Sequence, residues 1–327
     1  MEKEIRWGIA GLGNIAHKFA KELVQLPGCR LMAVASRNYD KASSFAQNYD
    51  TPLYFGSYQE LFGCEEVDVV YIATPHTSHA EISIQAMNAG KHVLCEKPLA
   101  VSRKEAVEMI ALAKEKKLFL MEALWTRFNP TILKVLDRIE SGDIGKLSYV
   151  RADFAFYALD NDEQGRLLNP QLAGGSILDI GIYPIFLAYL LLGMPEKISA
   201  ISNFYKTGAE IQTSMIFSYP EAQAILYSGL NSKSEMRAEI SGTTGSIFLD
   251  PRWHETQGYT LENNGQQDHF DHPTIGKGYT YEIQEVNNCL RQGRTQSELW
   301  SHQNSLDLLE LMDEVRAQSK VVFPFEG

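Results

Sequence analysis

The sequence predicts an α/β fold in which a doubly wound parallel sheet is followed by an antiparallel sheet. Up to about residue 120, short apolar runs alternate with helical patterns, as in sheets whose strands are joined by crossover helices. A glycine pattern lies at the first junction from strand to helix. Beyond residue 146, strand-like runs follow one another with little helix between them, which is typical of antiparallel sheets.

The expected elements of the first part follow in chain order. Runs rich in β-branched and apolar residues predict strands at residues 5–9, 30–35, 67–73, 91–95 and 118–122. Helical patterns lie between them, at residues 16–25, 41–48, 79–89 and 103–116. We therefore expect a parallel sheet with helices on both faces.

The second part is expected to be an antiparallel sheet that one long helix follows. Strand-like runs occupy residues 147–156, 197–205, 211–219, 222–230 and 237–241, and the helix candidate spans residues 301–318. We place the boundary near residues 122–129. The predicted domains are residues 1–122 and residues 123–327.

Composition argues against several kinds of partner. The formal net charge of the 327 residues is −11, which argues against nucleic acid or an anionic membrane. No signal sequence is recognisable, and no apolar stretch reaches the roughly 18 residues of a membrane span. The four cysteines form no C-x-x-C pair. We expect a cytoplasmic protein with reduced thiols and no structural metal.

A glycine-rich segment marks the expected cofactor site. The first expected strand leads into Gly11, Gly13 and Ala16, in the pattern G-x-G-x-x-[GA]. Gly11 permits a tight turn, Gly13 leaves room for phosphates, and Ala16 lets the helix pack close to the strand. The order of strand, glycines and helix predicts that free N–H groups at the helix start bind a dinucleotide pyrophosphate.

The end of the second expected strand indicates which nicotinamide cofactor binds. An acidic residue about 20 positions after the glycines normally bonds the adenosine ribose. Ser36 and Arg37 occupy that place instead. A hydroxyl and a guanidinium can bind a 2′-phosphate through charge-assisted hydrogen bonds, whereas a carboxylate would repel it. We expect NADP rather than NAD; in the alternative interpretation, Arg37 is a solvated loop arginine.

A lysine follows the fourth of these strands directly. In Cys95-Glu96-Lys97-Pro98, Lys97 stands at the carboxyl end of an apolar strand, the edge at which doubly wound sheets bind ligands. Pro98 restricts Lys97 to extended conformations and so holds its direction. A lysine in this place can also be merely solvated.

A second segment, GGSILDIGIYP at residues 174–184, combines apolar residues with Asp179 and Tyr183. These two residues are four apart and would share a face of a helical turn. Pro184 predicts a break near Gly181, with a second helix at about residues 183–192. The tyrosine could simply pack in the core, but an aspartate in an apolar stretch needs a partner.

Together these segments resemble the glucose-fructose oxidoreductase, inositol dehydrogenase and rhizopine-catabolism (Gfo/Idh/MocA) family, and most of all its NADP-dependent dihydrodiol and D-xylose dehydrogenase branch. The matching segments, in the family's order, are GLGNIA at 11–16, Ser36-Arg37, TPHTSH at 74–79, EKP at 96–98, EALWTRFNP at 122–130 and GGSILDIGIYP at 174–184. The resemblance implies an N-terminal Rossmann domain and a C-terminal α+β domain. The second domain would have a large, mostly antiparallel open-faced sheet that carries the substrate site.

The resemblance also implies roles for individual residues. Lys97 corresponds to the family's catalytic lysine, Tyr183 to the acid/base residue, and Asp179 to an aspartate one turn earlier. An isolated tyrosine has a pKa of about 10, and a nearby ammonium group favours the phenolate. Tyr183 would take the hydroxyl proton, assisted by Lys97, while hydride leaves for the nicotinamide. The expected cofactor-binding residues are Gly11, Gly13, Asn14, Ile15, Ser36, Arg37, Thr74, Pro75, His76, His79, Glu96 and Lys97, and the expected substrate-binding residues are Trp125, Arg127, Phe154 and Tyr183.

Three further features could be purely structural rather than functional. Trp253 resembles another wall residue of the pocket, but the loop lengths leave its position open. His76 and His79 could suggest a metal pair, yet no third ligand is apparent and the resembled family needs no metal, so we expect none. His269 and His272 lie in a polar stretch that we expect to be a solvated loop.

The leading hypothesis is an NADP-dependent oxidoreductase acting on a secondary alcohol or hemiacetal of a neutral sugar, a polyol or a vicinal diol. The alternatives are a regulator that senses NADP(H) without turnover and a reductase of a non-sugar carbonyl or imine. A sensor needs the glycine loop but no acid/base pair, so Lys97 and Tyr183 favour the enzyme. Aromatic walls favour neutral aldoses such as D-xylose, or cyclic vicinal diols, over sugar phosphates and hydroxy acids.

A sheet with helices on one face leaves its other face open to water. Alternation at residues 211–217 and 222–230 offers such an apolar face. We therefore expect a homodimer that forms face to face through these sheets, with a small molecule as the other partner.

Overall fold

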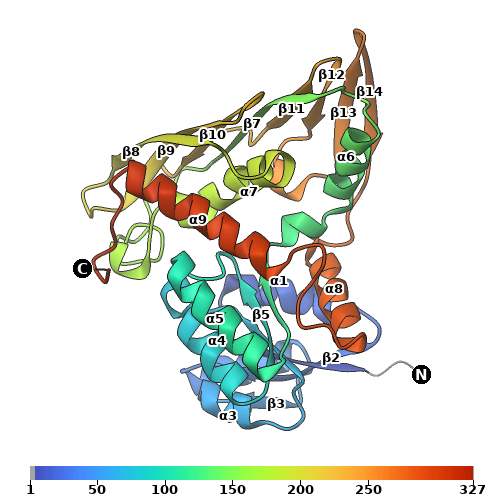
Figure 1. The fold of residues 1–327 in the computed structure, drawn as a ribbon. Helices are drawn as coiled ribbons and strands as arrows, with labels where there is room; N and C mark the ends of the chain where they lie inside the picture. The colour runs from blue at the N-terminus through green and yellow to red at the C-terminus, as the bar shows by residue number, and fades with distance from the viewer. Residues whose placement is uncertain (1–3, 327) are drawn as a thin grey trace. The chain divides into compact units, whose positions relative to one another are not determined.

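The computed structural model describes residues 4–326 and divides into two compact units (Figure 1). Unit 1 comprises the chain up to Phe128 together with the returning segment Ile275–Leu306. Unit 2 comprises Asn129–Thr274 and the chain from Asp307 onward. The expected division into residues 1–122 and 123–327 differs from these units, because it left the returning segment in the second domain.

Unit 1 is built on a six-stranded parallel sheet with the order β3-β2-β1-β4-β5-β6. Ligands bind outside the carboxyl ends of the strands in sheets of this order. The central strands are buried almost throughout, which explains their continuous apolar sequences. The strands are β1 (Ile5–Ala10), β2 (Cys29–Ala35), β3 (Leu53–Phe55), β4 (Val69–Ile72), β5 (His92–Glu96) and β6 (Leu120–Ala123).

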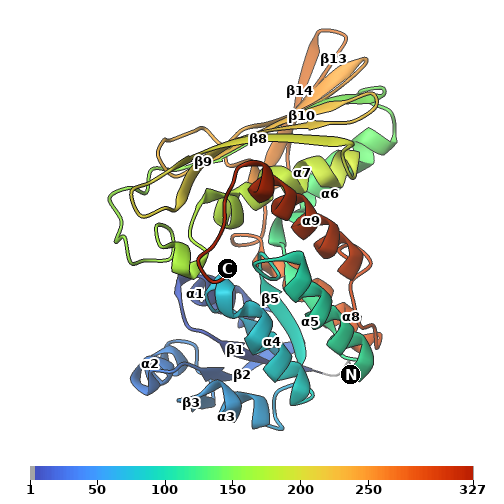
Figure 2. The ribbon, with the colours of Figure 1, turned by 60° about the vertical axis from the view of Figure 1, so that its left-hand side comes forward.

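The helices of unit 1 begin in two different ways. Side chains of Asn38, Ser57 and Ser102 cap three of them by accepting a hydrogen bond from a backbone N–H of the first turn. The first helix follows Gly13 and has no side-chain cap. Figure 2 shows α2 and α3 near β3, at one edge of the sheet. The helices are α1 (Asn14–Leu23), α2 (Tyr39–Asn48), α3 (Tyr58–Gly63), α4 (His79–Asn88), α5 (Arg103–Lys116) and α8 (Tyr279–Arg291).

Buried polar bonds hold the returning segment on unit 1. The Glu22 carboxylate of α1 accepts hydrogen bonds from the backbone N–H groups of Lys277 and Thr280, at 2.6 and 2.8 Å. These groups lie at the start of α8, where N–H donors otherwise lack partners. Trp7 of β1 also donates its Nε1–H to Asn287 of α8, at 3.0 Å. The segment therefore completes the first unit, although nothing in its local sequence pattern predicts this.

Unit 2 is built on an eight-stranded sheet with the order β14-β13-β12-β11-β7-β10-β9-β8. Only β7 and β10 pair in parallel, so the prediction of a mostly antiparallel sheet is confirmed. His269 lies in the last strand, and the expectation of a solvated loop there was wrong. The strands are β7 (Leu147–Ala155), β8 (Lys197–Phe204), β9 (Glu210–Ser218), β10 (Gln223–Gly229), β11 (Ala238–Gly242), β12 (Gly245–Leu249), β13 (Gly258–Asn263) and β14 (Gln266–Asp271).

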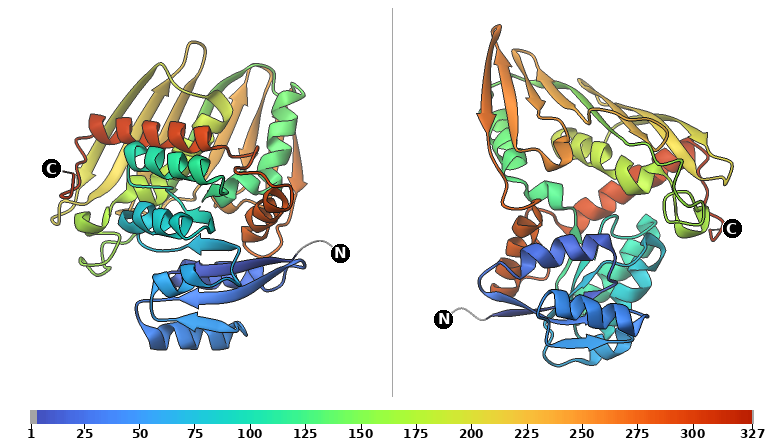
Figure 3. Two further views of the ribbon diagram at one scale, coloured as in Figure 1. Left: turned by 60° about the horizontal axis from the view of Figure 1, so that its bottom comes forward. Right: turned by 180° about the vertical axis from the view of Figure 1, so that it is seen from behind.

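Helices lie along one face of this sheet (Figures 1 and 3). They are α6 (Pro130–Glu140), α7 (Ile182–Leu192) and most of α9 (His302–Gln318), and α7 packs on β7 and β10. Tyr189 of α7 donates its hydroxyl to Asp307 of α9, at 2.7 Å. No helix formed by the described residues is long and apolar enough to cross a membrane.

The two faces of the sheet differ in composition. Alternate residues such as Met215 and Leu226 are buried on the side of the helices. Most of the apolar residues in β9 and β10 therefore face the helices. The opposite face presents Ile201, Ile216 and Ile225, with exposed fractions of 77%, 45% and 45%. An open face with three exposed isoleucines is therefore present, but it is less apolar than the sequence suggests.

Glu282 of α8 is a fully buried carboxyl group, and neither of its oxygens has a hydrogen-bond partner among the described residues. Burial, followed by the negative charges of Glu96 and Glu22, raises its pKa well above the usual value. The folded protein therefore keeps Glu282 protonated at pH values at which an unfolded glutamate is ionised.

We predict that Glu282→Gln stabilises the protein more at neutral pH than at acidic pH. Because the folded-state pKa is raised, the stabilisation from the bound proton is complete below the unfolded pKa of about 4.5 and is lost as the pH rises toward the folded-state pKa. The amide does not titrate, so its advantage should grow by up to about 1.4 kcal/mol per pH unit in that window. Urea unfolding at several pH values measures this difference. A difference that did not change with pH would contradict the prediction.

Candidate active site

The turn between β1 and α1 has the geometry of a phosphate cradle. Gly11 has a φ of +91°, and a β carbon there would lie 2.7 Å from the carbonyl oxygen of Ala73, so only glycine fits. A β carbon at Gly13 would meet nothing within 4 Å. The first turn of α1 contains no acidic residue, which leaves its N–H groups and the positive end of the helix dipole to an anion. These residues fit a dinucleotide pyrophosphate.

The end of β2 presents polar and basic groups next to β3. Ser36 donates its N–H to the carbonyl oxygen of Phe55, at 3.2 Å, and its Oγ accepts from the N–H of Asn38, at 3.1 Å. Arg37 is exposed. Burial raises the pKa of Tyr58, and the positive charge of the nearby Arg37 opposes this shift. The residues at the end of β2 include no carboxylate, so the polar groups available to a ligand there are the Ser36 hydroxyl and the Arg37 guanidinium.

Lys97 follows β5 at the same carboxyl edge of the sheet, and buried groups fix the backbone after it. Leu99 donates its N–H to the Glu122 carboxylate at 2.9 Å. Glu122 also accepts from Trp300 Nε1 at 3.0 Å and from Ser305 Oγ at 2.7 Å. Burial raises the pKa of Glu122, while these donors and the charge of Lys97 act in the opposite direction.

His79 joins the turn after β4 to the turn that contains Lys97. The ring is fully buried, with Nδ1 2.8 Å from the carbonyl oxygen of Pro98 and Nε2 2.9 Å from that of Thr74. A carbonyl oxygen only accepts, so the doubly protonated ring alone makes both bonds. Burial lowers the pKa of His79, and the two carbonyl groups oppose this effect. A direct contact of His79 with a cofactor would require one of these bonds to open.

The other expected cofactor residues occupy the same sheet edge. Glu96, at the end of β5, accepts hydrogen bonds from the Tyr71 hydroxyl and from the N–H of Lys97. Thr74 and Pro75 follow β4, and a short 3₁₀ turn begins at His76. The glycine turn after β1, the end of β2 and the turns after β4 and β5 therefore all lie at the carboxyl edge of the sheet in unit 1.

In unit 2, Asp179 and Tyr183 lie where a π-helical turn changes into an α-helix. The turn spans Ile177–Gly181, and α7 begins at Ile182. Pro184 falls in the first turn of α7, where a backbone N–H is not required. The break expected near Gly181 is this change of helix type. Short π-helical turns occur frequently at functional sites.

A buried carboxylate fixes the start of this turn. Glu210 of β9 is 1% exposed and accepts from the N–H groups of Ser176 and Ile177, at 2.8 and 3.0 Å. The hydroxyls of Ser176 and Thr213 also donate to it, each at 2.7 Å. Burial raises the pKa of Glu210, and these four donors oppose the shift. The turn that carries both candidate residues is thereby attached to the sheet.

Asp179 has a charged partner that the sequence analysis missed. Its Oδ1 accepts a hydrogen bond from Arg166 Nη1 at 2.7 Å. The Asp179 side chain is 11% exposed and that of Arg166 is 56% exposed. The aspartate in the apolar stretch therefore has the partner that its burial demands. Arg166 lies in the long loop before the π-helical turn, where no periodic pattern points to it.

Three aromatic rings of unit 2 form a cluster. Phe154 of β7 lies with its ring centroid 5.4 Å from that of Tyr183. His254 stacks on Phe154 at 4.1 Å and lies 5.4 Å from Tyr183. The preceding Trp253 is fully buried and donates Nε1–H to the carbonyl oxygen of Asp153, so its ring belongs to the core.

Trp125 and Arg127 belong to unit 1, whereas Phe154 and Tyr183 belong to unit 2. Trp125 stacks on Tyr279 of α8 with the ring centroids 5.0 Å apart. Arg127 is 9% exposed, and burial lowers its pKa while the charge of Glu285 opposes the shift. The expected substrate residues thus come from both units.

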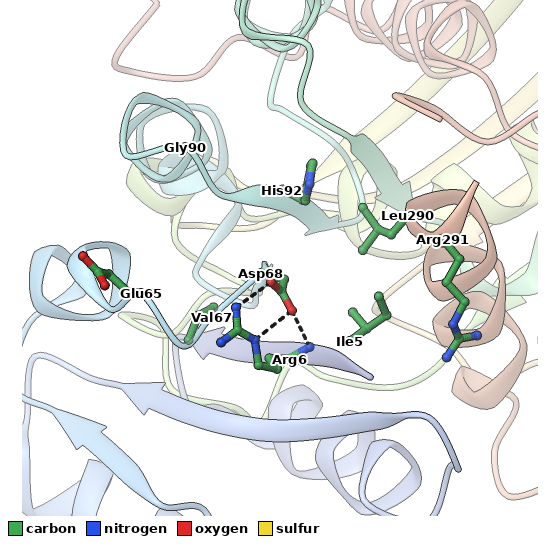
Figure 4. A pocket seen from close by; sticks show the side chains of 9 residues that line it. All are labelled: Ile5, Arg6, Glu65, Val67, Asp68, Gly90, His92, Leu290 and Arg291. Atoms are coloured by element: carbon green, nitrogen blue, oxygen red, sulfur yellow. Dashed lines mark hydrogen bonds and ion pairs between the residues drawn. The ribbon is translucent and has the colours of Figure 1, made fainter. Parts of the chain in front are cut away.

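A hollow of about 470 Å³ lies at the opposite, amino edge of the unit 1 sheet (Figure 4). Arg6 and Asp68 line it and bind each other through two side-chain hydrogen bonds, at 3.0 and 2.8 Å. None of the expected site residues lines it. Among the described residues, no group of three or more His, Cys, Asp and Glu side chains is placed to hold a metal ion.

Comparison of the sequence with models of known protein families identifies the family of this chain. Residues 5–124 match the model of the GFO/IDH/MocA oxidoreductase family, NAD-binding Rossmann fold. Residues 132–248 match the model of the GFO/IDH/MocA C-terminal domain. The chain belongs to this oxidoreductase family. The resemblance seen in the sequence is therefore confirmed, as is the two-part fold that it implies.

Relatives within the GFO/IDH/MocA family match this chain over almost its whole length. Trans-1,2-dihydrobenzene-1,2-diol dehydrogenase of Mus musculus is 36% identical and covers 98% of both chains. D-xylose 1-dehydrogenase (NADP(+)) of Hypocrea jecorina is 34% identical over 98% of this chain and 93% of the relative. Among solved structures, the 3-ketoreductase KijD10 from Actinomadura kijaniata in complex with NADP and TDP-benzene is 27% identical, with a TM-score of 0.89 over 97% of this chain and 98% of that chain.

We predict that Gly13→Ala weakens cofactor binding without changing stability. The new β carbon would meet no protein atom within 4 Å, but it would point into the space expected to hold the pyrophosphate. Gly63→Ala at the end of α3 adds a β carbon to similarly open space away from the turn and serves as the control. Thermal unfolding and titration with NADPH measure the two properties. Unchanged NADPH affinity in Gly13→Ala would exclude the cradle.

Proposed function

We propose that this chain is an NADP-dependent dehydrogenase of a secondary alcohol or hemiacetal carbon in a neutral sugar, a polyol or a vicinal diol. The observation that carries the proposal is the shared edge of one parallel sheet, where the open glycine cradle after β1 and Lys97 after β5 both lie. A group bound in the cradle would extend along the edge that presents the lysine.

Several features of unit 1 support NADP as the cofactor. The cradle accommodates a pyrophosphate, and Ser36 with the exposed Arg37 suits a 2′-phosphate. The D-xylose relative is named for NADP(+), and the KijD10 structure holds NADP. When bound, the nicotinamide exchanges a hydride with the substrate carbon.

In the proposed mechanism, Tyr183 moves the substrate proton. Its phenolate takes the hydroxyl proton during oxidation, and its phenol returns the proton during reduction. The ammonium charge of Lys97 favours the phenolate and so lowers the barrier to proton removal. Asp179, paired with Arg166, is proposed to orient substrate hydroxyls.

The proposed substrate class rests on aromatic surfaces and on the relatives. Phe154 and Trp125 can stack on the apolar face of a sugar or on a flat ring. The two relatives described above are named for a diol and for D-xylose. All four cysteines are free thiols, which accords with the proposed location in the cytoplasm.

Tyr183→Phe tests the acid/base role. The ring stays in the aromatic cluster, so folding and NADPH affinity should survive, while kcat on D-xylose or the diol falls by about two to four orders of magnitude. Lys97→Met should act in the same way. Tyr149→Phe on β7 removes a hydroxyl outside the cluster and should leave kcat unchanged. Near-normal turnover by Tyr183→Phe would refute the assignment.

Arg37→Ala tests the cofactor preference. Loss of one charge-assisted hydrogen bond to the 2′-phosphate should raise the KM for NADP by about 10- to 100-fold and leave the KM for NAD nearly unchanged. Arg30→Ala is the matched control because Arg30 is an exposed arginine in β2, at the end of the strand away from Arg37. Steady-state kinetics with both cofactors give the comparison. Equal preference in the unmodified protein would remove the argument.

We propose a homodimer that forms through the open face of the eight-stranded sheet. Ile216 and Ile225 lie on neighbouring strands of that face and are each 45% exposed. Replacing both with lysine should convert a dimer into a monomer in light scattering, because paired faces would bury two new charges per copy. Val322→Lys, at a 73% exposed site off the sheet, should leave the mass unchanged. A monomeric unmodified protein at micromolar concentration would contradict this proposal.

A further inference from the structure

His254 is a polar aromatic neighbour of both Phe154 and Tyr183. Its ring is 4% exposed, lies within 24° of the plane of the Phe154 ring and is stacked on it at 4.1 Å. The same ring lies 5.4 Å from Tyr183 at an angle of 51°. Phe154 and Tyr183 are themselves 5.4 Å apart, so each of the three rings contacts the other two.

The preceding residue explains why His254 lies there. Trp253 donates Nε1–H to the carbonyl oxygen of Asp153 at 2.9 Å, and its backbone N–H bonds the carbonyl oxygen of Met236 at 3.1 Å. Asp153 directly precedes Phe154 on β7. The tryptophan therefore anchors the 3₁₀ turn Trp253–Glu255 beside Phe154, and the next side chain meets the phenyl ring.

The pairing of a phenyl ring with an imidazole suits one kind of ligand better than another. A neutral imidazole offers one N–H donor and one acceptor, whereas a phenyl ring offers only an apolar face. An aldose presents an apolar face of ring C–H groups and several hydroxyls. A dihydrobenzenediol presents a hydrocarbon ring with only two hydroxyls. Sites that hydrogen-bond a substrate hydroxyl discriminate strongly against analogues that lack it.

We propose that His254 is a specificity-determining residue that hydrogen-bonds a substrate hydroxyl beyond the reacting carbon and its neighbour, and so selects neutral aldoses, which carry such a hydroxyl, over dihydrobenzenediols, which lack it. This inference rests on the proposed role of Tyr183, whose ring places the reacting carbon next to the cluster. Phe154 provides a stacking surface for both classes of substrate, and the hydrogen bond from His254 makes the enzyme prefer the aldose.

The test compares D-xylose with trans-1,2-dihydrobenzene-1,2-diol in the full-length protein with NADP. The unmodified protein should have the higher kcat/KM on D-xylose. His254→Phe keeps an aromatic ring and removes both nitrogens, so kcat/KM for D-xylose should fall by about 10- to 100-fold, while the value for the diol changes by less than about threefold. His254→Gln restores a donor and an acceptor and should recover part of the preference.

Two further variants complete the design. His254→Leu also removes both nitrogens and replaces His254→Phe if thermal unfolding shows that the phenylalanine variant does not fold. His269→Phe makes the same substitution on β14, where the side chain is 46% exposed, and should leave both substrates unaffected.

The outcomes distinguish failure of the role proposed for His254 from failure of the proposed function. If both substrates are turned over and their kcat/KM ratio is unchanged in His254→Phe, or if the unmodified protein prefers the diol, the role of His254 is refuted and the proposed function stands. If neither these substrates nor other neutral aldoses and diols reduce NADP, the proposed function fails, and the inference fails with it.

Discussion

Buried hydrogen bonds at the carboxyl edge of the six-stranded sheet fix the backbone after Lys97, and the candidate site depends on them. Glu122 accepts a hydrogen bond from the N–H of Leu99, and the buried His79 ring lies within hydrogen-bond distance of the carbonyl oxygens of Pro98 and Thr74. Leaving a buried donor or acceptor unpaired costs about 1–3 kcal/mol, so the turn has little freedom to rearrange. A lysine on such a turn points in a defined direction, whereas a lysine on a loose loop would simply be solvated.

In unit 2, a buried carboxyl group likewise fixes the turn that carries the candidate residues. Glu210 accepts four hydrogen bonds and attaches the turn with Asp179 and Tyr183 to the sheet. Burial of a carboxylate is unfavourable, but several donors offset the lost hydration. Glu282 illustrates the other outcome, because a buried carboxyl without donors is held protonated. Burial raises the pKa of both Glu210 and Glu282, and hydrogen-bond donors oppose the shift at Glu210, whereas the charges of Glu96 and Glu22 add to it at Glu282.

The sequence predicts those features that depend on neighbours along the chain. The glycine cradle, the apolar strands and the helix Arg103–Lys116 are local patterns, and the structure reproduces them to within a residue or two. The three-residue strand β3 and the short helix α3 are too brief for a periodic signal, and both were missed. The helices α6 and α8 and the strands β12, β13 and β14 were missed as well. The return of Ile275–Leu306 to unit 1 depends on partners such as Glu22, more than 250 positions away. Arg166 and His254 reach the candidate site through loops whose paths only the folded chain defines.

Hydride transfer from a neutral aldose to NADP is the central claim, and isotopic labelling tests it most directly. The protein is incubated with NADP and D-xylose deuterated at C1, and the reduced cofactor is examined by nuclear magnetic resonance. Direct transfer predicts deuterium at C4 of the nicotinamide, a slower reaction than with unlabelled sugar, and no label in the Tyr183→Phe variant over the same time. Reduced cofactor that carries no deuterium, or no reduction with any neutral aldose or diol, would contradict the claim.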